Sequence, residues 1–217
     1  MGDVISLTDR RRELAATPAR RASRFARTTF SFDLMLPQTY LAAERVERLF
    51  AGVRWQPASA EVLWVGPPPI DRLRAEADER AGALGVPLVW PDPYPTDVRP
   101  AMRAAALACE LGRGAAFVLA AGRLAFCGGF DLGDPEVLAE AAAAADLPLD
   151  LCLSAAGDQS RDGAIEEASR RLLAAGADTL PVLRVERTLY AGEGRLAEAL
   201  AAAGAARPSH GPRPASA

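Results

Sequence analysis

The chain has 217 residues, which suits one domain or one domain with a large insertion. Its formal net charge is −3 at pH 7, so it has no overall attraction to nucleic acid or to an anionic membrane surface. No apolar run reaches the roughly 18 residues that a membrane helix needs. We therefore expect a cytoplasmic protein whose partners include neither nucleic acid nor a membrane.

The two ends of the chain differ in composition from its middle. Residues 1–27 contain seven arginines, but no apolar segment of the kind that follows the basic residues of a secretory signal. We interpret them as a disordered basic arm, with binding of an acidic partner as the alternative. Residues 204–217 are rich in Pro, Ala and Ser, which predicts a disordered tail.

The first predicted elements alternate between strand and helix. Residues 28–34 alternate in hydrophobicity and are rich in Thr and Phe, which predicts a strand. Pro37 suits the first turn of a helix, which the apolar spacing continues to residue 50. Residues 53–65 are predicted as a second strand region, weakened at Pro57. A strand–helix–strand unit favours a parallel pair with a right-handed crossover.

The next hundred residues are predicted to be mainly helical. Apolar spacing and turns with Gly or Asp place helices at 70–84, 97–111, 115–126, 135–145, 149–155 and 163–175. Strands at 179–186 and 188–191 and a helix at 195–203 complete the order. We therefore divide the chain into an α/β domain, formed by 28–69 and 158–203, and an all-helical insertion at 70–157. We expect the insertion to cover the helix-start face of the sheet and to form one wall of an apolar cleft.

The cysteines show no disulfide or metal-binding pattern. Cys109, Cys127 and Cys152 form no CxxC pair, and the one histidine of the chain, His210, lies in the C-terminal tail. We therefore predict neither a disulfide framework nor a metal site. All three cysteines lie in apolar segments, so we predict that they are buried small hydrophobic residues.

Four stretches occur in an order and spacing that is typical of one known family. They are residues 32–42 (FDLMLPQTYLA), 94–105 (YPTDVRPAMRAA), 130–138 (FDLGDPEVL), and the pair 179–181 (TLP) with 190–196 (YAGEGRL). Together they resemble the DsbA-like superfamily, and most of all its branch of kappa-class glutathione transferases and 2-hydroxychromene-2-carboxylate isomerase. The resemblance implies an α/β thioredoxin-like fold with an all-helical insertion. It also implies a glutathione-dependent isomerase or transferase that acts on a small apolar or aromatic electrophile.

The first stretch matches the strand-to-helix turn that carries the reactive residues of this family. A group just before a helix N-terminus is favoured when it is anionic, so a cysteine there becomes a reactive thiolate. By the resemblance, Leu36 has the position of this nucleophile and Thr39 has that of the second cysteine. Leucine has no nucleophilic atom, and a dithiol exchange needs both sulfurs. The sequence therefore excludes disulfide exchange at this site.

The fourth stretch matches ligand-binding positions of the family. The resemblance implies that Pro181 follows a cis peptide bond and that the main chain of Leu180 pairs with the peptide of glutathione. Glu193 and Gly194 have the places of a Ser–Asp pair that holds the γ-glutamyl carboxylate. Glutathione is thus the candidate cofactor. The predicted ligand-binding residues are Leu36, Pro37, Gln38, Thr39, Leu180, Pro181, Glu193 and Gly194.

The sequence leaves two functions open. One is catalysis in which glutathione supplies the thiolate, and the other is non-catalytic binding of a ligand or partner in the same cleft. In both cases we expect a small apolar molecule as the ligand. The sequence also leaves open whether the protein forms a homodimer.

Several polar residues also have plain structural interpretations. Thr39 suits a first-turn hydrogen bond, and Asp97 suits a helix cap. Arg103 and Arg195 suit internal salt bridges. Asp33 is either a buried acid near the helix start or a solvated acid in a loop.

Overall fold

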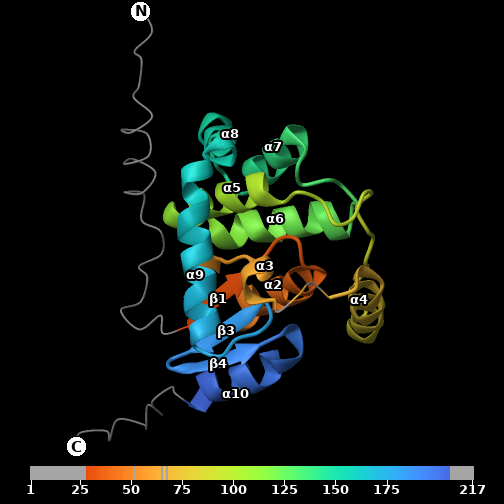
Figure 1. Cartoon of the computed structure of the whole chain (residues 1–217), viewed down its shortest axis with the longest axis vertical. Helices are drawn as coiled ribbons and strands as arrows, with labels where there is room; N and C mark the ends of the chain where they lie inside the picture. The colour runs from red at the N-terminus through yellow and green to blue at the C-terminus, as the bar shows by residue number, and fades with distance from the viewer. Residues whose placement is uncertain (1–27, 51, 65, 67, 206–217) are drawn as a thin grey trace, which may run out of the picture.

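The computed structural model describes residues 28–50, 52–64, 66 and 68–205, and these form a four-stranded mixed sheet with helices around it (Figure 1). β1 (Thr28–Phe32) is parallel to β2 (Arg54–Pro57) and antiparallel to β3 (Val182–Val185). β3 pairs with the antiparallel β4 (Thr188–Ala191), so the strand order is β2-β1-β3-β4. The parallel pair expected from the first strand, helix and strand is confirmed.

The segment after β1 confirms the predicted helix and corrects the second strand. α2 (Pro37–Leu49) begins with proline, whose missing N–H would have no partner in the first turn of a helix. β2 ends at Pro57, and the chain then forms a short helix, α3 (Ala60–Leu63), where strand was predicted. The N–H of Ala60 donates to the carboxylate of Asp33 at 2.8 Å, so it is not free to continue a strand ladder.

The insertion is helical, as predicted, and each helix is within two residues of its predicted bounds. α5 and α6 lie next to the sheet and α2, and α7 and α8 lie on their outer side (Figure 1). α4 lies at the edge of the molecule, beside α2. The helices are α4 (Ile70–Leu84), α5 (Arg99–Glu110), α6 (Gly114–Phe126), α7 (Pro135–Ala144) and α8 (Leu149–Gly157).

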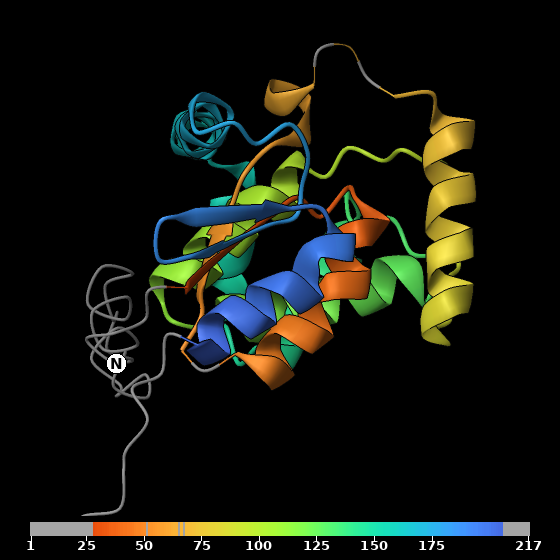
Figure 2. The same cartoon turned by 90° about the horizontal axis from the view of Figure 1, so that it is seen from below.

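The remaining helices sandwich the sheet (Figure 2). α9 (Asp162–Ala174) follows the 3₁₀ turn η1 (Gln159–Arg161) and covers one face together with α3. α10 (Leu196–Ala205) follows the 3₁₀ turn η2 (Glu193–Arg195) and lies beside α2 on the other face. The start of α2 therefore lies at one end of the sheet, where the chain leaves β1.

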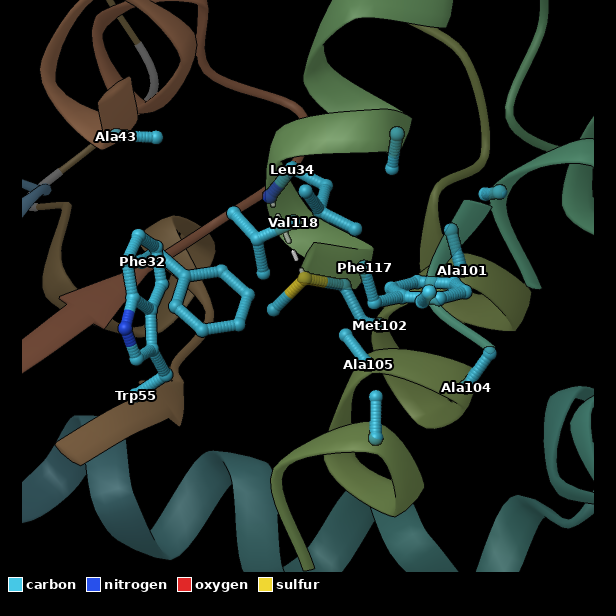
Figure 3. Close-up of a cluster of buried hydrophobic side chains, with 14 of the residues drawn as sticks. Phe32, Leu34, Ala43, Trp55, Ala101, Met102, Ala104, Ala105, Phe117 and Val118 are labelled. Atoms are coloured by element: carbon cyan, nitrogen blue, oxygen red, sulfur yellow. Dashed lines mark hydrogen bonds between the residues drawn. The ribbon is translucent and has the colours of Figure 1, made fainter. Parts of the chain in front are cut away.

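The largest hydrophobic cluster joins the sheet to the insertion. Phe32 of β1 and Trp55 of β2 lie opposite Met102 of α5 and Phe117 of α6 (Figure 3). The N–H of Leu34 donates to the thioether sulfur of Met102 at 3.3 Å, which ties the end of β1 to α5. Because these side chains are buried against one another, the sheet and the insertion share one core.

An ion pair fastens the insertion to α9. Arg103 of α5 is 8% exposed and donates to both carboxylate oxygens of Asp162, at 2.6 Å each, and to the Ala156 carbonyl at 3.1 Å. At the other end of the molecule, Arg195 pairs with Glu198 at 2.7 Å. Both predicted internal salt bridges are confirmed.

The start of α5 matches the predicted cap only in part. Val98 is the N-cap residue, and its side chain makes no capping hydrogen bond. Asp97 instead accepts the N–H of Arg99 at 3.1 Å and pairs with the Arg99 guanidinium, which lowers the pKa of Asp97 below its ordinary value. Asp97 therefore binds Arg99, the first residue of α5, from the position just before the N-cap residue.

Candidate functional site

The turn between β1 and α2 places Leu36 at the start of the helix, as predicted. The Leu36 N–H donates to the Asp33 carbonyl at 3.2 Å, and the Thr39 N–H donates to the Leu36 carbonyl at 3.0 Å. Leu36 is the N-cap residue of α2 and has an extended backbone, but its side chain supplies no capping bond. Pro37 is buried and Gln38 is half-buried in the first turn that follows.

The Thr39 side chain forms its hydrogen bond within the β1–α2 turn. Its side chain is 2% exposed, and its hydroxyl accepts the N–H of Asp33 at 3.3 Å. A first-turn hydrogen bond was predicted for Thr39, and its partner proves to be Asp33, the residue that follows β1. The hydroxyl therefore stabilises the strand-to-helix turn.

Asp33 is a buried acid near the helix start, so the alternative of a solvated acid in a loop is wrong. It is 4% exposed, and its carboxylate accepts the N–H of Met35 at 2.9 Å and that of Ala60 at 2.8 Å. Burial raises the pKa of Asp33 to about 6, although the two N–H donors act in the opposite direction. The acid thus joins the β1–α2 turn to the turn before α3.

Leu36 and Leu180 lie in one buried cluster. Leu36 is 3% exposed and Leu180 is 1% exposed, and the peptide bond between Leu180 and Pro181 is cis. Two predicted site segments that are far apart in the sequence therefore meet at the start of α2. That these residues bind a ligand stays a prediction. The buried members of the cluster are Leu36, Ala58, Ala60, Leu63, Leu73, Leu172, Ala177, Leu180 and Val182.

Glu193 is buried in a three-way ion pair. It is 4% exposed and binds Arg45 of α2 and Arg80 of α4, with Arg80 Nη2 at 3.1 Å from Glu193 Oε1. These contacts join α2, α4 and η2. Neighbouring Gly194 is exposed, and a Cβ added there would meet no atom within 4 Å. The arginine partners were not predicted, because both lie more than a hundred residues from Glu193 in the sequence.

Aromatic side chains from the loop before α5 lie near the start of α2. The Tyr94 hydroxyl donates to the Met35 carbonyl at 3.0 Å, and its ring lies 4.7 Å from that of Trp90. Burial raises the pKa of the Tyr94 hydroxyl above its ordinary value. The Arg74 guanidinium lies 5.0 Å from the Trp90 ring and 5.4 Å from the Tyr94 ring. Tyr94 belongs to a stretch that carries the resemblance, whereas nothing in the sequence pattern singled out Arg74.

The cysteines are free, and the prediction that all three are buried fails at Cys127, which is exposed. Cys152 is buried and Cys109 is half-buried. Burial raises the pKa of Cys109 to about 12 and that of Cys152 to about 11. Cys127 is exposed because it follows the last residue of α6, where the chain leaves the core. Its sulfur lies 2.8 Å from the hydroxyl of Tyr40.

The described residues contain neither a cluster suited to a metal ion nor a membrane-spanning helix. No group of three or more His, Cys, Asp or Glu side chains there is arranged to hold a metal ion. In the same part of the chain, no helix is both long enough and apolar enough to cross a bilayer.

The strand order, the cis peptide bond before β3 and the helices inserted between β2 and α9 define an α/β thioredoxin-like fold with a helical insertion. No protein-family model and no curated protein matches the sequence. Solved structures do match it. One is 2-hydroxychromene-2-carboxylate isomerase, with a TM-score of 0.69 and 19% identity over 82% of this chain and 94% of that chain.

Two other solved structures have names that point to disulfide chemistry. A probable DsbA oxidoreductase from Streptomyces coelicolor matches with a TM-score of 0.62 and 18% identity, over 88% of this chain and 94% of that chain. A putative protein disulfide isomerase from Nitrosomonas europaea matches with a TM-score of 0.61 and 17% identity, over 85% and 98%. At such identities the likeness establishes the fold, and the expected fold class is confirmed.

Proposed function

We propose that this chain binds a small apolar or aromatic molecule beside the start of α2 and carries out no thiol chemistry there. The observation that carries the proposal is the burial of Leu36, which is 3% exposed at the helix start. In the place of a nucleophile, an aliphatic side chain packs in one cluster with Leu180. An aliphatic side chain at this position offers apolar contact and no reacting atom.

The polar residues at the other predicted positions support the same proposal. Thr39 is 2% exposed and its hydroxyl accepts a hydrogen bond from its own turn, so burial shields it from a bound thiol. The Glu193 carboxylate is paired with Arg45 and Arg80, and it has no donor of its own to offer the carboxylate of glutathione. Both residues therefore have structural partners where relatives of the resembled branch would bind ligand.

The apolar or aromatic character of the ligand follows from the side chains around the turn. Met35, Trp90 and Tyr94 are half-buried, and all three pack against the cluster that contains Leu36. Aromatic rings bind planar apolar molecules by stacking or edge contact. A ligand held there would cover the exposed parts of these rings.

The test uses the uncharged fluorescent probe N-phenyl-1-naphthylamine with the full chain and two leucine variants. We expect the probe to bind, and we expect Leu36→Ser to weaken binding about fivefold or more, because apolar contact is lost. Leu49→Ser is the matched control, since Leu49 lies at the far end of the same helix and is 40% exposed. No binding to the unaltered chain, or equal affinities for the two variants, would contradict the proposal. Circular dichroism checks that both variants are folded.

A second function, glutathione-dependent isomerisation or transfer, is favoured by the likeness to 2-hydroxychromene-2-carboxylate isomerase. On this alternative, the main chain of Leu180 pairs with the peptide of glutathione, as the resemblance implies, and this contact does not depend on the identity of the side chains. On this alternative, Leu36→Ser restores a hydroxyl that can hydrogen-bond the glutathione thiolate.

Calorimetric titration with glutathione separates the two functions. We expect the unaltered chain to bind glutathione weakly and to reduce insulin no faster than background. If Leu36→Ser binds glutathione more tightly and gains transferase or isomerase activity, the second function replaces the first. Tight binding by the unaltered chain would overturn the assignment of Leu36 and Glu193 as obstacles.

A further inference from the structure

Three buried polar side-chain atoms in the described residues have no hydrogen-bond partner. They are Gln38 Oε1, Arg74 Nε and Arg161 Nε. Arg161 is otherwise compensated, because its Nη1 lies 2.8 Å from Glu110 and its Nε lies 3.6 Å from the Asp158 carboxylate. The other two atoms lie near the start of α2, one in its first turn and one on α4. Buried polar atoms are nearly always hydrogen-bonded, so an atom without a partner in the protein calls for one outside it, such as a water, an ion or a bound molecule.

Arg74 differs from the other buried and half-buried arginines of the described chain. Each of those others has a carboxylate partner. Arg74 makes neither an ion pair nor a hydrogen bond among these residues. The paired arginines are Arg45, Arg80, Arg103, Arg113 and Arg161, and their carboxylates belong to Glu193, Asp162, Asp146 and Glu110. Arg74 is thus a fixed positive charge that lacks its anion.

Two aromatic rings hold the Arg74 guanidinium in place. It lies over Trp90 and Tyr94, and the Trp90 indole N–H donates to Asp78 at 3.0 Å. The Tyr94 hydroxyl is bound to the Met35 carbonyl, one residue before Leu36. Contact with the ring faces leaves the N–H edge of a guanidinium available to an anion. The charge therefore lies beside the helix start, where the dipole of α2 also favours a negative group.

The position of α4 supports a common site for these groups. Leu73, next to Arg74 in the chain, belongs to the buried cluster of Leu36. In Figure 2, α4 lies on the side of α2 where that helix begins. Gln38 occupies the second position of α2, so its unpartnered oxygen is in the turn that follows Leu36.

We propose that Arg74 selects an anionic ligand for the site at the start of α2, and that Gln38 Oε1 accepts a hydrogen bond from the same ligand. The inference rests on the proposed function and specifies its ligand class. The ligand is a small organic anion with an apolar body and a hydrogen-bond donor. Leu36, Trp90 and Tyr94 contact the body, and Arg74 pairs with the negative group.

The test compares two probes of similar shape that differ in charge, the anion 8-anilinonaphthalene-1-sulfonate and the neutral N-phenyl-1-naphthylamine. The measured quantity is the ratio of their affinities for the full chain at constant ionic strength. We expect Arg74→Gln to lower this ratio about tenfold, because it removes a charge-assisted contact to the sulfonate only. Arg72→Gln is the matched control: it lies on the same helix, changes the net charge equally, and its side chain is 73% exposed and paired with Glu76.

The outcomes separate this inference from the proposed function. A ratio that falls in Arg74→Gln and stays constant in Arg72→Gln supports the inference. An unchanged ratio in Arg74→Gln, or an equal fall in both variants, overturns it and leaves apolar binding intact. Failure of both probes to bind the unaltered chain overturns the inference together with the proposed function.

Discussion

Asp33 and Glu193 are both 4% exposed, and both lie where the chain enters a helical segment, but they are stabilised in opposite ways. Asp33 accepts two main-chain N–H groups, and no ion pair reaches it within the described residues. Glu193 is bound by the side chains of Arg45 and Arg80. The first acid is held by local backbone and the second by distant cations.

The difference determines what each acid does for the molecule. Main-chain donors fix two turns, but they do not compensate the loss of water, so burial raises the pKa of Asp33 to about 6. Guanidinium groups supply full opposite charges, so Glu193 stays compatible with burial while it ties three elements together. The Asp33 region is therefore sensitive to pH, whereas the Glu193 region depends on its two arginines.

The largest effect is expected when both cations of Glu193 are removed. The double variant Arg45→Ala/Arg80→Ala leaves a buried carboxylate alone, which should lower the free energy of unfolding by about 3–5 kcal/mol. Urea unfolding at pH 7.5 measures the change. Glu193→Gln should cost less, because the two arginine side chains are 24% and 39% exposed and can turn to water.

The control for this prediction removes two arginines from surface pairs. Arg72 and Arg195 are 73% and 51% exposed in their pairs, so Arg72→Ala/Arg195→Ala should shift the urea midpoint far less than the first double variant does. If the two double variants unfold at the same urea concentration, Glu193 is not held as described.

The second effect concerns pH and Asp33. In the folded chain its pKa is about 6, and its ordinary value is 3.8, so the folded state binds more protons between these limits. The stability that the protonated carboxyl contributes is complete below pH 3.8 and is lost as the pH rises through about 6. The loss amounts to about 3 kcal/mol at most.

This contribution is isolated by subtraction. Asp33→Asn cannot titrate at this position, so the unfolding free energy of the original chain minus that of the variant should decrease between pH 4 and pH 7. Other carboxyl groups contribute equally to both curves and cancel. Parallel curves over this range would show that burial does not raise the pKa of Asp33 in the folded chain.

Local patterns account for most of what the sequence predicted correctly. Proline at the start of α2, the alternation in β1 and the turns between the inserted helices each depend on neighbouring residues, and the structure has them where expected. The place of Leu36 and Thr39 at the helix start also follows from short spacing.

Features built by distant contacts were missed for a physical reason. The bond from Ala60 to Asp33 turns the end of the second strand region into a helix, and its two residues are 27 positions apart. Arg45 and Arg80 reach Glu193 across 148 and 113 positions. No periodicity or short motif encodes such pairs, because each depends on how elements pack after they have formed.

The smallest of the three effects tests the hydroxyl that completes the Asp33 region. Thr39→Val keeps a β-branched side chain of similar size in the first turn of α2, but it leaves the buried N–H of Asp33 without its acceptor, now at 3.3 Å. We expect a loss of about 1 kcal/mol in the free energy of unfolding, at the lower end of the cost of such a group because the bond is long. Thr188→Val, on the exposed end of β4, is the control and should stay within about 0.5 kcal/mol of the original chain. Equal effects of the two substitutions would mean that the Thr39 hydroxyl does not stabilise the turn.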